Sequence, residues 1–341
     1  MAIAVPIIWK YSMEMTVECC SVLIFCITMT FKTIMCQTDT VKNLLKYILK
    51  KQAELKSSID NESKQIYIKH QNVTYFFIGL ITFQTGVAAV CLLLTKYHSY
   101  WDMETNQSYP NITMYRKKPL PYVIWLPFNS DEHYVPAFIL HSIAASIGVI
   151  FNAITITFYL TVMIFIRCQL KILQLRIRTL DTTINKAELE VKNRLRSLII
   201  DHQTIIEFSK QFNNDINLIL LLDFTLNSAQ LASICFQMIT RDLSRIMMLF
   251  LFNYLVLTLL QIFSFSWYAN EIKEQSLGVA DAIYEHNWYE QSVSIRKTLL
   301  LMMMRAQKPL TLTIGPFFTM TNSIPLTVMK AAYSYVTLMT T

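Results

Sequence analysis

Glycine and charged residues are both scarce in this chain. Its 341 residues include 5 glycines, and 16% are charged, whereas soluble domains carry about a quarter. Phosphate-binding loops of the GxGxxG and Walker types are absent, as are the HExxH and GxSxG motifs of metalloproteases and hydrolases. The sequence gives no positive support for an enzyme, and we expect no cofactor.

Patterns typical of metal sites and disulfides are also missing. The chain has 7 cysteines, nearly all in or beside apolar runs, which is typical of small buried side chains. Cys19 and Cys20 are adjacent and do not form a CxxC pair, and the 6 histidines show no ligand spacing. The net charge of +7 comes from basic residues spread between apolar runs, so we expect no nucleic-acid partner.

Hydrophobic residues make up 53% of the chain and gather into long runs. A run of about 20 apolar residues can cross a bilayer as a helix, and none of these runs alternates as a barrel strand does. We therefore predict an all-α, polytopic transmembrane helical bundle. The six expected spans lie near residues 15–36, 75–95, 137–166, 216–239, 246–268 and 310–338.

The first run contains two charged residues, Glu18 and Lys32. Both lie near its ends, so we expect their side chains to extend to the membrane interface.

The connecting segments indicate the orientation. Residues 37–74 carry seven Lys or Arg, residues 168–213 carry eight and residues 269–309 carry five. Residues 96–136 carry four Lys or Arg, and four acidic residues in the same segment offset their charge. The positive-inside rule then places the segments 37–74, 168–213 and 269–309 in the cytoplasm. The C-terminus is then expected outside the cell.

The cytoplasmic segments show helical spacing of apolar residues at 40–56, 167–212 and 269–305. We predict helices that extend beyond the bilayer and form an anchor layer that contacts neighbouring subunits. The expected organisation is transmembrane helices with these extensions at 1–267, anchor helices at 268–309 and a last transmembrane helix at 310–341.

The order of several motifs resembles the insect odorant receptor family. The strongest part is WYANEIKEQSLGVADAIYEHNWYE from Trp267, then RKTLLLMMMRAQKPL, then the terminal PFFTMTNSIPLTVMKAAYSYVTLM. Further upstream, LPYVIWLPFNSDEHY (Leu120 to Tyr134) resembles the second extracellular loop of that family. Family members have seven spans, so we interpret the six expected here as spans two to seven, with the first span missing.

The resemblance implies a function. Such receptors are odorant-gated, non-selective cation channels, tetrameric, with the last helix of each subunit around the pore. The segment between the spans at 137–166 and 216–239 is shorter than in the family's co-receptor, which favours a tuning subunit that assembles with that co-receptor. The expected partners are thus a small volatile odorant, the co-receptor and membrane lipid. The expected location is the plasma membrane of an olfactory neuron's dendrite.

The resemblance also implies site residues. Family pockets lie in the outer halves of four spans, and Tyr254 offers one polar group on an otherwise apolar wall. The expected odorant-binding residues are Ser21, Phe25, Gly86, Val90, Ile143, Ile147, Ile150, Phe151, Phe250 and Tyr254. The expected pore and gate residues are Ser334, Tyr335, Leu338 and Thr341, with Leu338 forming an apolar ring that closes the pore by dewetting.

Two alternatives remain. A gustatory receptor shares the architecture, although this chain ends in Ala-Tyr-Ser-Tyr and not in the Thr-Tyr and Gln-Phe signature of that family. A secondary transporter is a further alternative, but no inverted repeat is found. The acidic residues near mid-membrane that such a transporter needs would be Asp215 or Asp223.

The topology predicts glycans at Asn106 or Asn111 and none at Asn61, because the segment 96–136 is expected to face the lumen. Glycosidase digestion of variants with each Asn changed to Gln measures this. A mobility shift that depends on Asn61 would reverse the orientation.

Overall fold

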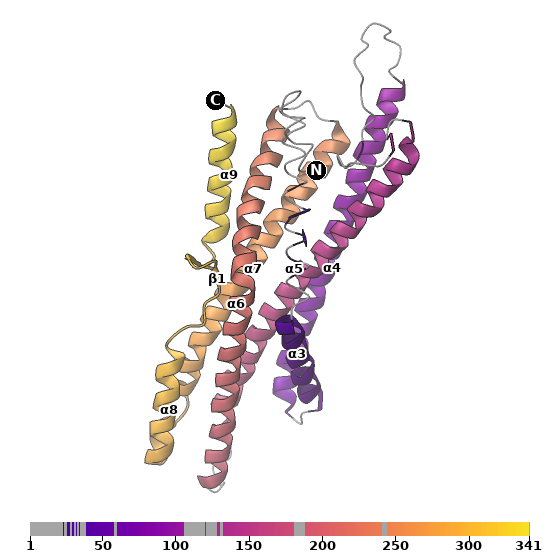
Figure 1. Cartoon of the computed structure of the whole chain (residues 1–341). Helices are drawn as coiled ribbons and strands as arrows, with labels where there is room; N and C mark the ends of the chain where they lie inside the picture. The colour runs from indigo at the N-terminus through magenta and orange to yellow at the C-terminus, as the bar shows by residue number, and fades with distance from the viewer. Residues whose placement is uncertain are drawn as a thin grey trace.

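The computed structural model is an elongated helical bundle (Figure 1). It describes scattered residues between 23 and 34, and then residues 39–57, 60–105, 120, 128–129, 132–180, 188–240 and 244–340. The helices are α3 (Asp39–Ser57), α4 (Asn61–Thr105), α5 (Tyr134–Arg178), α6 (Glu188–Thr240), α7 (Arg245–Glu285), the 3₁₀ turn η1 (Trp288–Glu290), α8 (Val293–Ala306) and α9 (Ile324–Thr340). The prediction of an all-α membrane bundle is confirmed.

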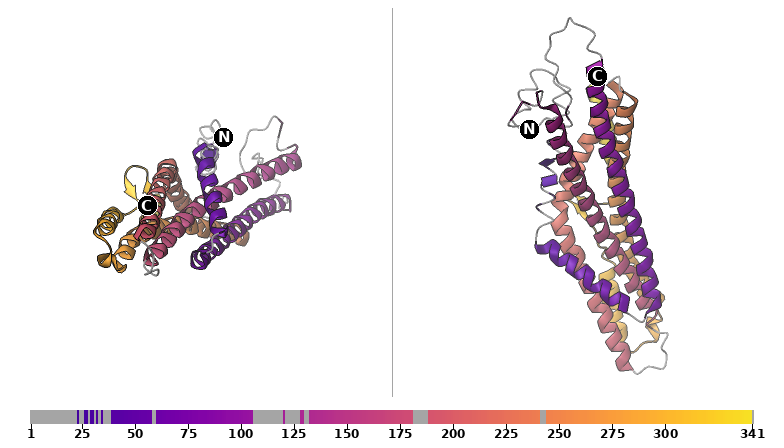
Figure 2. Two further views of the ribbon diagram at one scale, coloured as in Figure 1. Left: turned by 90° about the horizontal axis from the view of Figure 1, so that it is seen from below. Right: turned by 90° about the vertical axis from the view of Figure 1, so that its right-hand side faces the viewer.

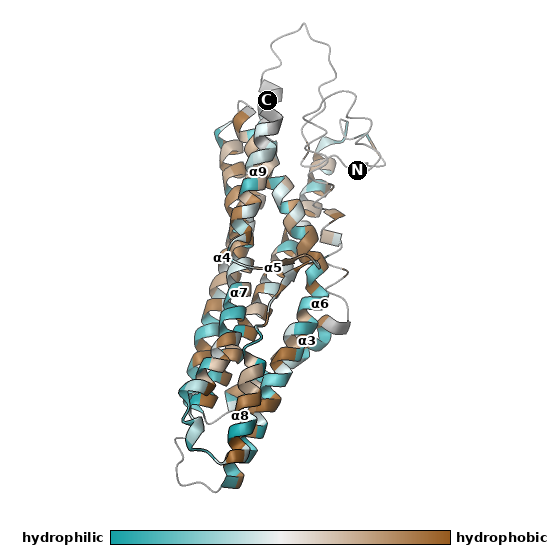
Figure 3. Ribbon diagram, turned by 90° about the vertical axis from the view of Figure 1, so that its left-hand side faces the viewer, coloured by the Kyte–Doolittle hydropathy of each residue, from teal (hydrophilic) through white to brown (hydrophobic). Residues whose placement is uncertain are grey.

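Four of the described helices are long and apolar enough to cross a membrane. They are α4, α5, α6 and α7, and they contain the second to fifth expected spans. The 45 residues of α5 make a helix about 68 Å long, more than twice the roughly 30 Å of a bilayer core. The predicted helical extensions are therefore present, and hydrophilic residues gather toward the end of the bundle that holds α8 (Figure 3).

The sixth expected span is shorter than predicted. Residues 310–323 are not helical, and they contain a two-stranded antiparallel hairpin, β1 (Thr313–Ile314) paired with β2 (Phe318–Thr319). Gly315 at its turn has a φ of 58°, a left-handed conformation that glycine adopts without strain, and Pro316 follows it. The prediction of a helix from 310 was wrong for this segment, because Gly-Pro favours a turn over a helix.

The hairpin is attached to α6 by hydrogen bonds. The backbone N–H of Thr313 donates to Asn213 Oδ1 at 2.7 Å, and that of Gly315 donates to the Asn217 carbonyl at 2.8 Å. A β-carbon at Gly315 would lie 2.9 Å from the end of the Leu221 side chain, which would have to shift, and the left-handed φ would strain any other residue here. These contacts fix the point from which α9 rises along the bundle (Figure 1).

The bundle is packed more tightly in its α8 half than in its other half. From Tyr159 to Ile177 most side chains of α5 are buried, against residues of α6 and α7 such as Phe212 and Phe265. In the first half of α5, by contrast, apolar side chains are exposed, for example Val135 at 65%. Figures 1 and 2 show α4 and α5 diverging from α6, α7 and α9 in that half.

One buried ion pair joins the first expected span to α6. The ammonium of Lys32 lies 2.5 Å from Asp223 Oδ1, and their side chains are 4% and 6% exposed. Gln261 on α7 donates from Nε2 to the other oxygen of Asp223 at 2.5 Å. The expectation that Lys32 extends to the interface was wrong, because a carboxylate within the bundle provides a partner in place of water. Glu18 lies outside the described residues.

Removing one member of this pair should destabilise the fold strongly. Asp223→Leu leaves the Lys32 ammonium buried without its counter-charge, so we expect a loss of about 3–5 kcal/mol. The double variant Lys32→Met with Asp223→Leu buries no charge and should recover most of that loss. Thermal unfolding of the purified protein in detergent measures both.

A matched control lies on the same helix. Asp201 pairs with Lys51 and Arg176 at 3.4 Å but is 25% exposed, so Asp201→Leu should cost at most about 1 kcal/mol. Equal losses for Asp223→Leu and Asp201→Leu, with no recovery in the double variant, would contradict the role given to Lys32.

Candidate functional site

A small polar cavity lies beside the buried ion pair, inside the membrane-length part of the bundle. Its volume is about 20 Å³. Residues of the first expected span, α5, α6 and α7 line it: Met29, Lys32, Asn152, Asp223, Leu226, Asn227, Gln230, Tyr254, Leu257, Thr258 and Gln261. Eight of these eleven side chains carry a polar group, which is unusual for a site among apolar helices and marks it as a functional candidate.

The helical repeat explains how the sequence builds this cavity. On α6, Asp223 is followed four and seven residues later by Asn227 and Gln230, and on α7, Tyr254 is followed at the same spacing by Thr258 and Gln261. Residues at this spacing share one face of a helix. Two polar stripes therefore face each other, and the Tyr254 hydroxyl donates to Gln230 Oε1 at 2.9 Å across the interface.

The expected odorant-binding residues do not all lie at the same place in the structure. Tyr254 lines the cavity, and its ring is stacked on that of Phe250 with centroids 6.1 Å apart. Ser21 and Phe25 lie outside the described residues. The others are exposed on α4 and α5, in the half where the helices diverge: Gly86, Val90, Ile143, Ile147, Ile150 and Phe151. Their role in binding stays a prediction.

Helix α9 contacts the rest of the chain along a narrow stripe. Pro325, Val328 and Ala332 are buried, whereas most of its other described side chains are exposed, including Ser334 and Tyr335. Leu338 lies within α9, and Thr341 is outside the described residues. Most of the described surface of α9 is therefore not covered by the other described helices of the chain.

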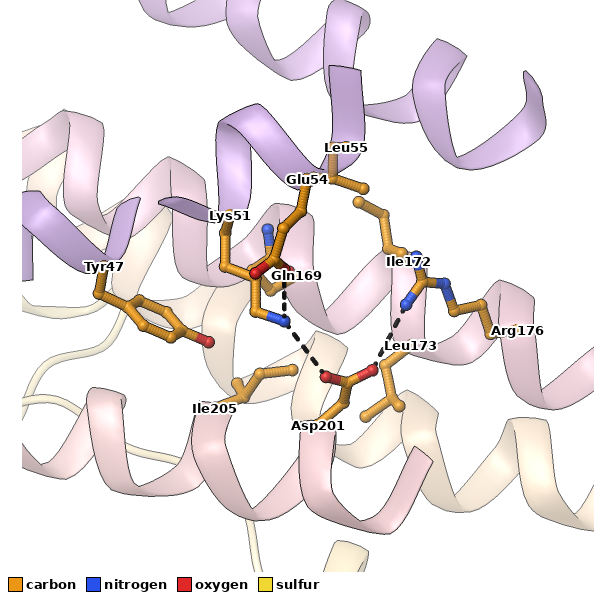
Figure 4. Close-up of a pocket in the computed structure, with 10 residues that line it drawn as sticks. All are labelled: Tyr47, Lys51, Glu54, Leu55, Gln169, Ile172, Leu173, Arg176, Asp201 and Ile205. Atoms are coloured by element: carbon orange, nitrogen blue, oxygen red, sulfur yellow. Dashed lines mark hydrogen bonds and ion pairs between the residues drawn. The ribbon is translucent and has the colours of Figure 1, made fainter. Parts of the chain in front are cut away.

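A second polar cavity, of about 130 Å³, lies between α3, α5 and α6 in the α8 half of the bundle (Figure 4). Asp201 accepts from both Lys51 and Arg176 at 3.4 Å, so one carboxylate joins three helices. Burial lowers the pKa of Lys51, but the Asp201 and Glu54 carboxylates outweigh it, so this pKa lies above its usual range. The charges within the cavity compensate one another, which is typical of a structural link between helices.

A groove of about 640 Å³ runs between α6 and α8, near the end of the bundle that holds α8. Ile199 and Ile206 line it from α6, and Leu301 and Met302 from α8. Leu301 is 67% exposed and Met304, on the same helix, is 64% exposed. Charged side chains, among them Glu207, Lys210 and Arg305, line the groove as well. The groove is thus a mixed apolar and charged surface outside the expected membrane spans.

The burial of the cysteines agrees in part with the sequence prediction. Cys91 and Cys168 are buried, as predicted for small apolar side chains, whereas Cys26 is exposed and Cys235 is half-buried. Among the described residues, no three His, Cys, Asp or Glu side chains are grouped as a metal site.

Known proteins resemble this chain in sequence. The family model described as 7tm Odorant receptor matches residues 12–333. Odorant receptor 10 of Aedes albopictus is 28% identical over 237 residues, which are 68% of this chain and 62% of that protein. The odorant receptor coreceptor of Aedes aegypti is 25% identical over 150 residues, which are 44% of this chain and 31% of that protein. The chain thus matches less than two thirds of the length of either relative.

A solved structure shares the fold. The insect olfactory receptor OR5 from Machilis hrabei, in complex with eugenol, superposes with a TM-score of 0.73 at 18% identity. The superposition covers 96% of this chain and 81% of that one. Since the family model matches most of the sequence and the bundle has the same architecture, the chain belongs to the 7tm odorant receptor family.

Proposed function

We propose that this chain is a tuning subunit of an insect odorant receptor. It binds small volatile odorants within the membrane bundle and gates a non-selective cation channel. It does so as a hetero-tetramer with the olfactory co-receptor. The family match favours this function over the gustatory receptor and the secondary transporter, and a receptor channel requires no enzymatic activity.

The observation that carries the proposal is the surface of α9. A helix in contact with lipid alone gains little from polar side chains, yet Ser334 and Thr337 are exposed on α9, with Tyr335 between them. Polar groups at such positions suit the wall of an ion pathway. In the proposed hetero-tetramer, α9 of this chain would form part of the pore wall, beside the last helices of the other subunits.

The groove between α6 and α8 and the exposed apolar side chains of Leu301 and Met304 on α8 support assembly with a partner subunit. Exposed apolar surface outside the membrane is costly for a monomer and is typical of a protein interface. Leu301 and Met304 would become buried when a neighbouring subunit packs there. In this arrangement the α8 end is cytoplasmic, and α9 ends at the extracellular face of the plasma membrane.

The first functional prediction concerns the partner. Odorant-evoked current should require expression of this chain together with the co-receptor, because the tetramer needs its contacts. Whole-cell recording with and without the co-receptor measures this. Robust odorant-evoked currents from this chain alone would contradict the heteromeric channel.

The second functional prediction concerns the gate. Leu338→Ala should widen the apolar ring and raise the leak current without odorant by about tenfold, which corresponds to about 1.4 kcal/mol off the barrier. Recording of leak current together with surface expression measures this.

Val328→Ala is the matched control, because Val328 is a buried side chain on the same helix that packs on the chain's own core. It should reduce surface expression modestly without a rise in leak per channel. If Leu338→Ala reaches the surface with the leak and ion selectivity of the parent, Leu338 does not form the gate.

A further inference from the structure

Helix α3 has two faces of different character. Its inner face packs on the bundle, where Leu44 and Leu55 are 2% and 4% exposed. Tyr47 and Lys51 line the polar cavity between α3, α5 and α6, and Lys51 binds Asp201 there (Figure 4). The residues of the outer face are exposed and lie at helical spacing, and we call them the Lys–Leu face: Lys42, Leu45, Lys46, Leu49, Lys50 and Lys56.

The Lys–Leu face combines positive charge with apolar surface. Leu45 is 42% exposed and Leu49 is 62% exposed. Among the described residues, neither Lys46 nor Lys50 pairs with a carboxylate, and Glu54 of the same helix pairs with Lys51 at 3.2 Å. Lysines beside exposed leucines on one helix are typical of a helix that lies on an anionic membrane surface.

Helix α3 lies at the cytoplasmic boundary of the expected membrane region. It begins at Asp39, directly after the first expected span, which ends near residue 36. The ring of Tyr47 packs on that of Phe165 with centroids 6.2 Å apart, where the expected span at 137–166 ends. Leu55 packs against Cys168 and Ile172, just beyond that span. The middle and the end of α3 therefore contact α5 where α5 leaves the bilayer.

The orientation of α3 also gives lipid access to its outer face. In Figure 2, α3 crosses the direction of the long helices obliquely, whereas the adjacent α4 follows the bundle. Figures 1 and 2 show α3 on the side of the bundle away from α8 and α9. In the proposed assembly α9 faces the pore, which leaves α3 at the lipid-facing periphery.

The adjacent helices add positive charge at the same level. Lys69 lies on α4, and Arg167 and Lys171 lie on α5, close in sequence to the residues that α3 contacts. Glu271 on α7 compensates Arg167 at 2.7 Å. Burial lowers the pKa of Lys171, Arg167 and Lys69 lower it further, and Glu271 offsets this only in part. An anion at this level would thus be stabilised.

We propose that the Lys–Leu face of α3 binds the anionic phospholipids of the cytoplasmic leaflet. Leu45 and Leu49 insert at the boundary between headgroups and acyl chains, and Lys46 and Lys50 donate to the lipid phosphates. Each lysine near an anionic surface strengthens binding about fivefold. Because α3 directly follows the span that carries Lys32, this contact would hold the cytoplasmic end of that span at the membrane surface.

The first experiment measures the lipid preference of the purified chain in phosphatidylcholine vesicles. The probes are spin-labelled phosphatidylserine and spin-labelled phosphatidylcholine, and electron paramagnetic resonance gives the fraction of each that contacts the protein. The parent should bind phosphatidylserine at least about fivefold more strongly. Lys46→Gln with Lys50→Gln should lose most of this preference, whereas Lys46→Arg with Lys50→Arg should keep it, because the charge stays.

Arg196→Gln with Lys297→Gln is the matched control, because it removes the same charge from exposed side chains of α6 and α8. Residues 196 and 216 are about 30 Å apart along α6, so Arg196 lies several Debye lengths of about 8 Å from the start of the expected span. This control should keep the preference of the parent. All four substituted side chains are exposed, so every variant should unfold at the temperature of the parent.

The second experiment tests the apolar part of the face without a change of charge. Leu49→Trp adds a fluorophore to the face, and brominated phosphatidylcholine in mixed vesicles with phosphatidylserine quenches tryptophan that lies within the bilayer. Most of the emission added to that of the parent should be quenched. Leu301→Trp on α8 is the matched control, since Leu301 is 67% exposed, and its added emission should not be quenched.

Three results would overturn the inference. The first is equal binding of the two labelled lipids by the parent. The second is a preference that Lys46→Gln with Lys50→Gln leaves intact, or that the Arg196 and Lys297 control removes to the same extent. The third is unquenched emission from Leu49→Trp, which would place the face in water, as for the docking of an acidic protein. None of these measurements uses an odorant or the co-receptor, so they are independent of the proposed function.

Discussion

The pairing of Lys32 with Asp223 is the interaction on which the membrane part of the structure depends. An ammonium and a carboxylate without water are each very unfavourable, so the first expected span and α6 are stable together and costly apart. Gln261 extends the constraint to α7 by completing the hydrogen bonds of the carboxylate. The same cluster places polar side chains where an apolar core would otherwise close, and it thereby creates the cavity.

Packing divides the bundle into a tightly packed half and an open half. Around Met163 and Ile272 the side chains between the helices are almost fully buried. Toward the opposite end α4 and α5 diverge, and their apolar side chains are exposed. The polar cavity lies among the helices that connect these halves. Its lining residues come from α5, α6 and α7 together, and α6 carries the hairpin that positions α9.

Periodicity and hydropathy predicted the parts of the fold that depend on local sequence. Helix α3 and the extensions of α5 and α6 follow from apolar residues at helical spacing. The pairing of Lys32 with Asp223 could not be predicted in this way, since an ion pair between distant segments leaves no periodic pattern in either segment. The hairpin was missed although Gly315 and Pro316 marked it. The stripe Asp223, Asn227 and Gln230 was visible at helical spacing. Exposed apolar residues such as Ile143 give the same sequence pattern whether lipid or a ligand covers them.

The central claim is that the chain is a channel subunit whose last helix surrounds the pore. A cryo-electron microscopy structure of the chain assembled with the co-receptor, with and without an odorant that evokes current, tests it most directly. We expect α9 at the central axis with Ser334 and Tyr335 toward the pore side, and the α6–α8 groove covered by a neighbouring subunit. A structure with α9 at the lipid-facing periphery and the groove exposed would contradict the account.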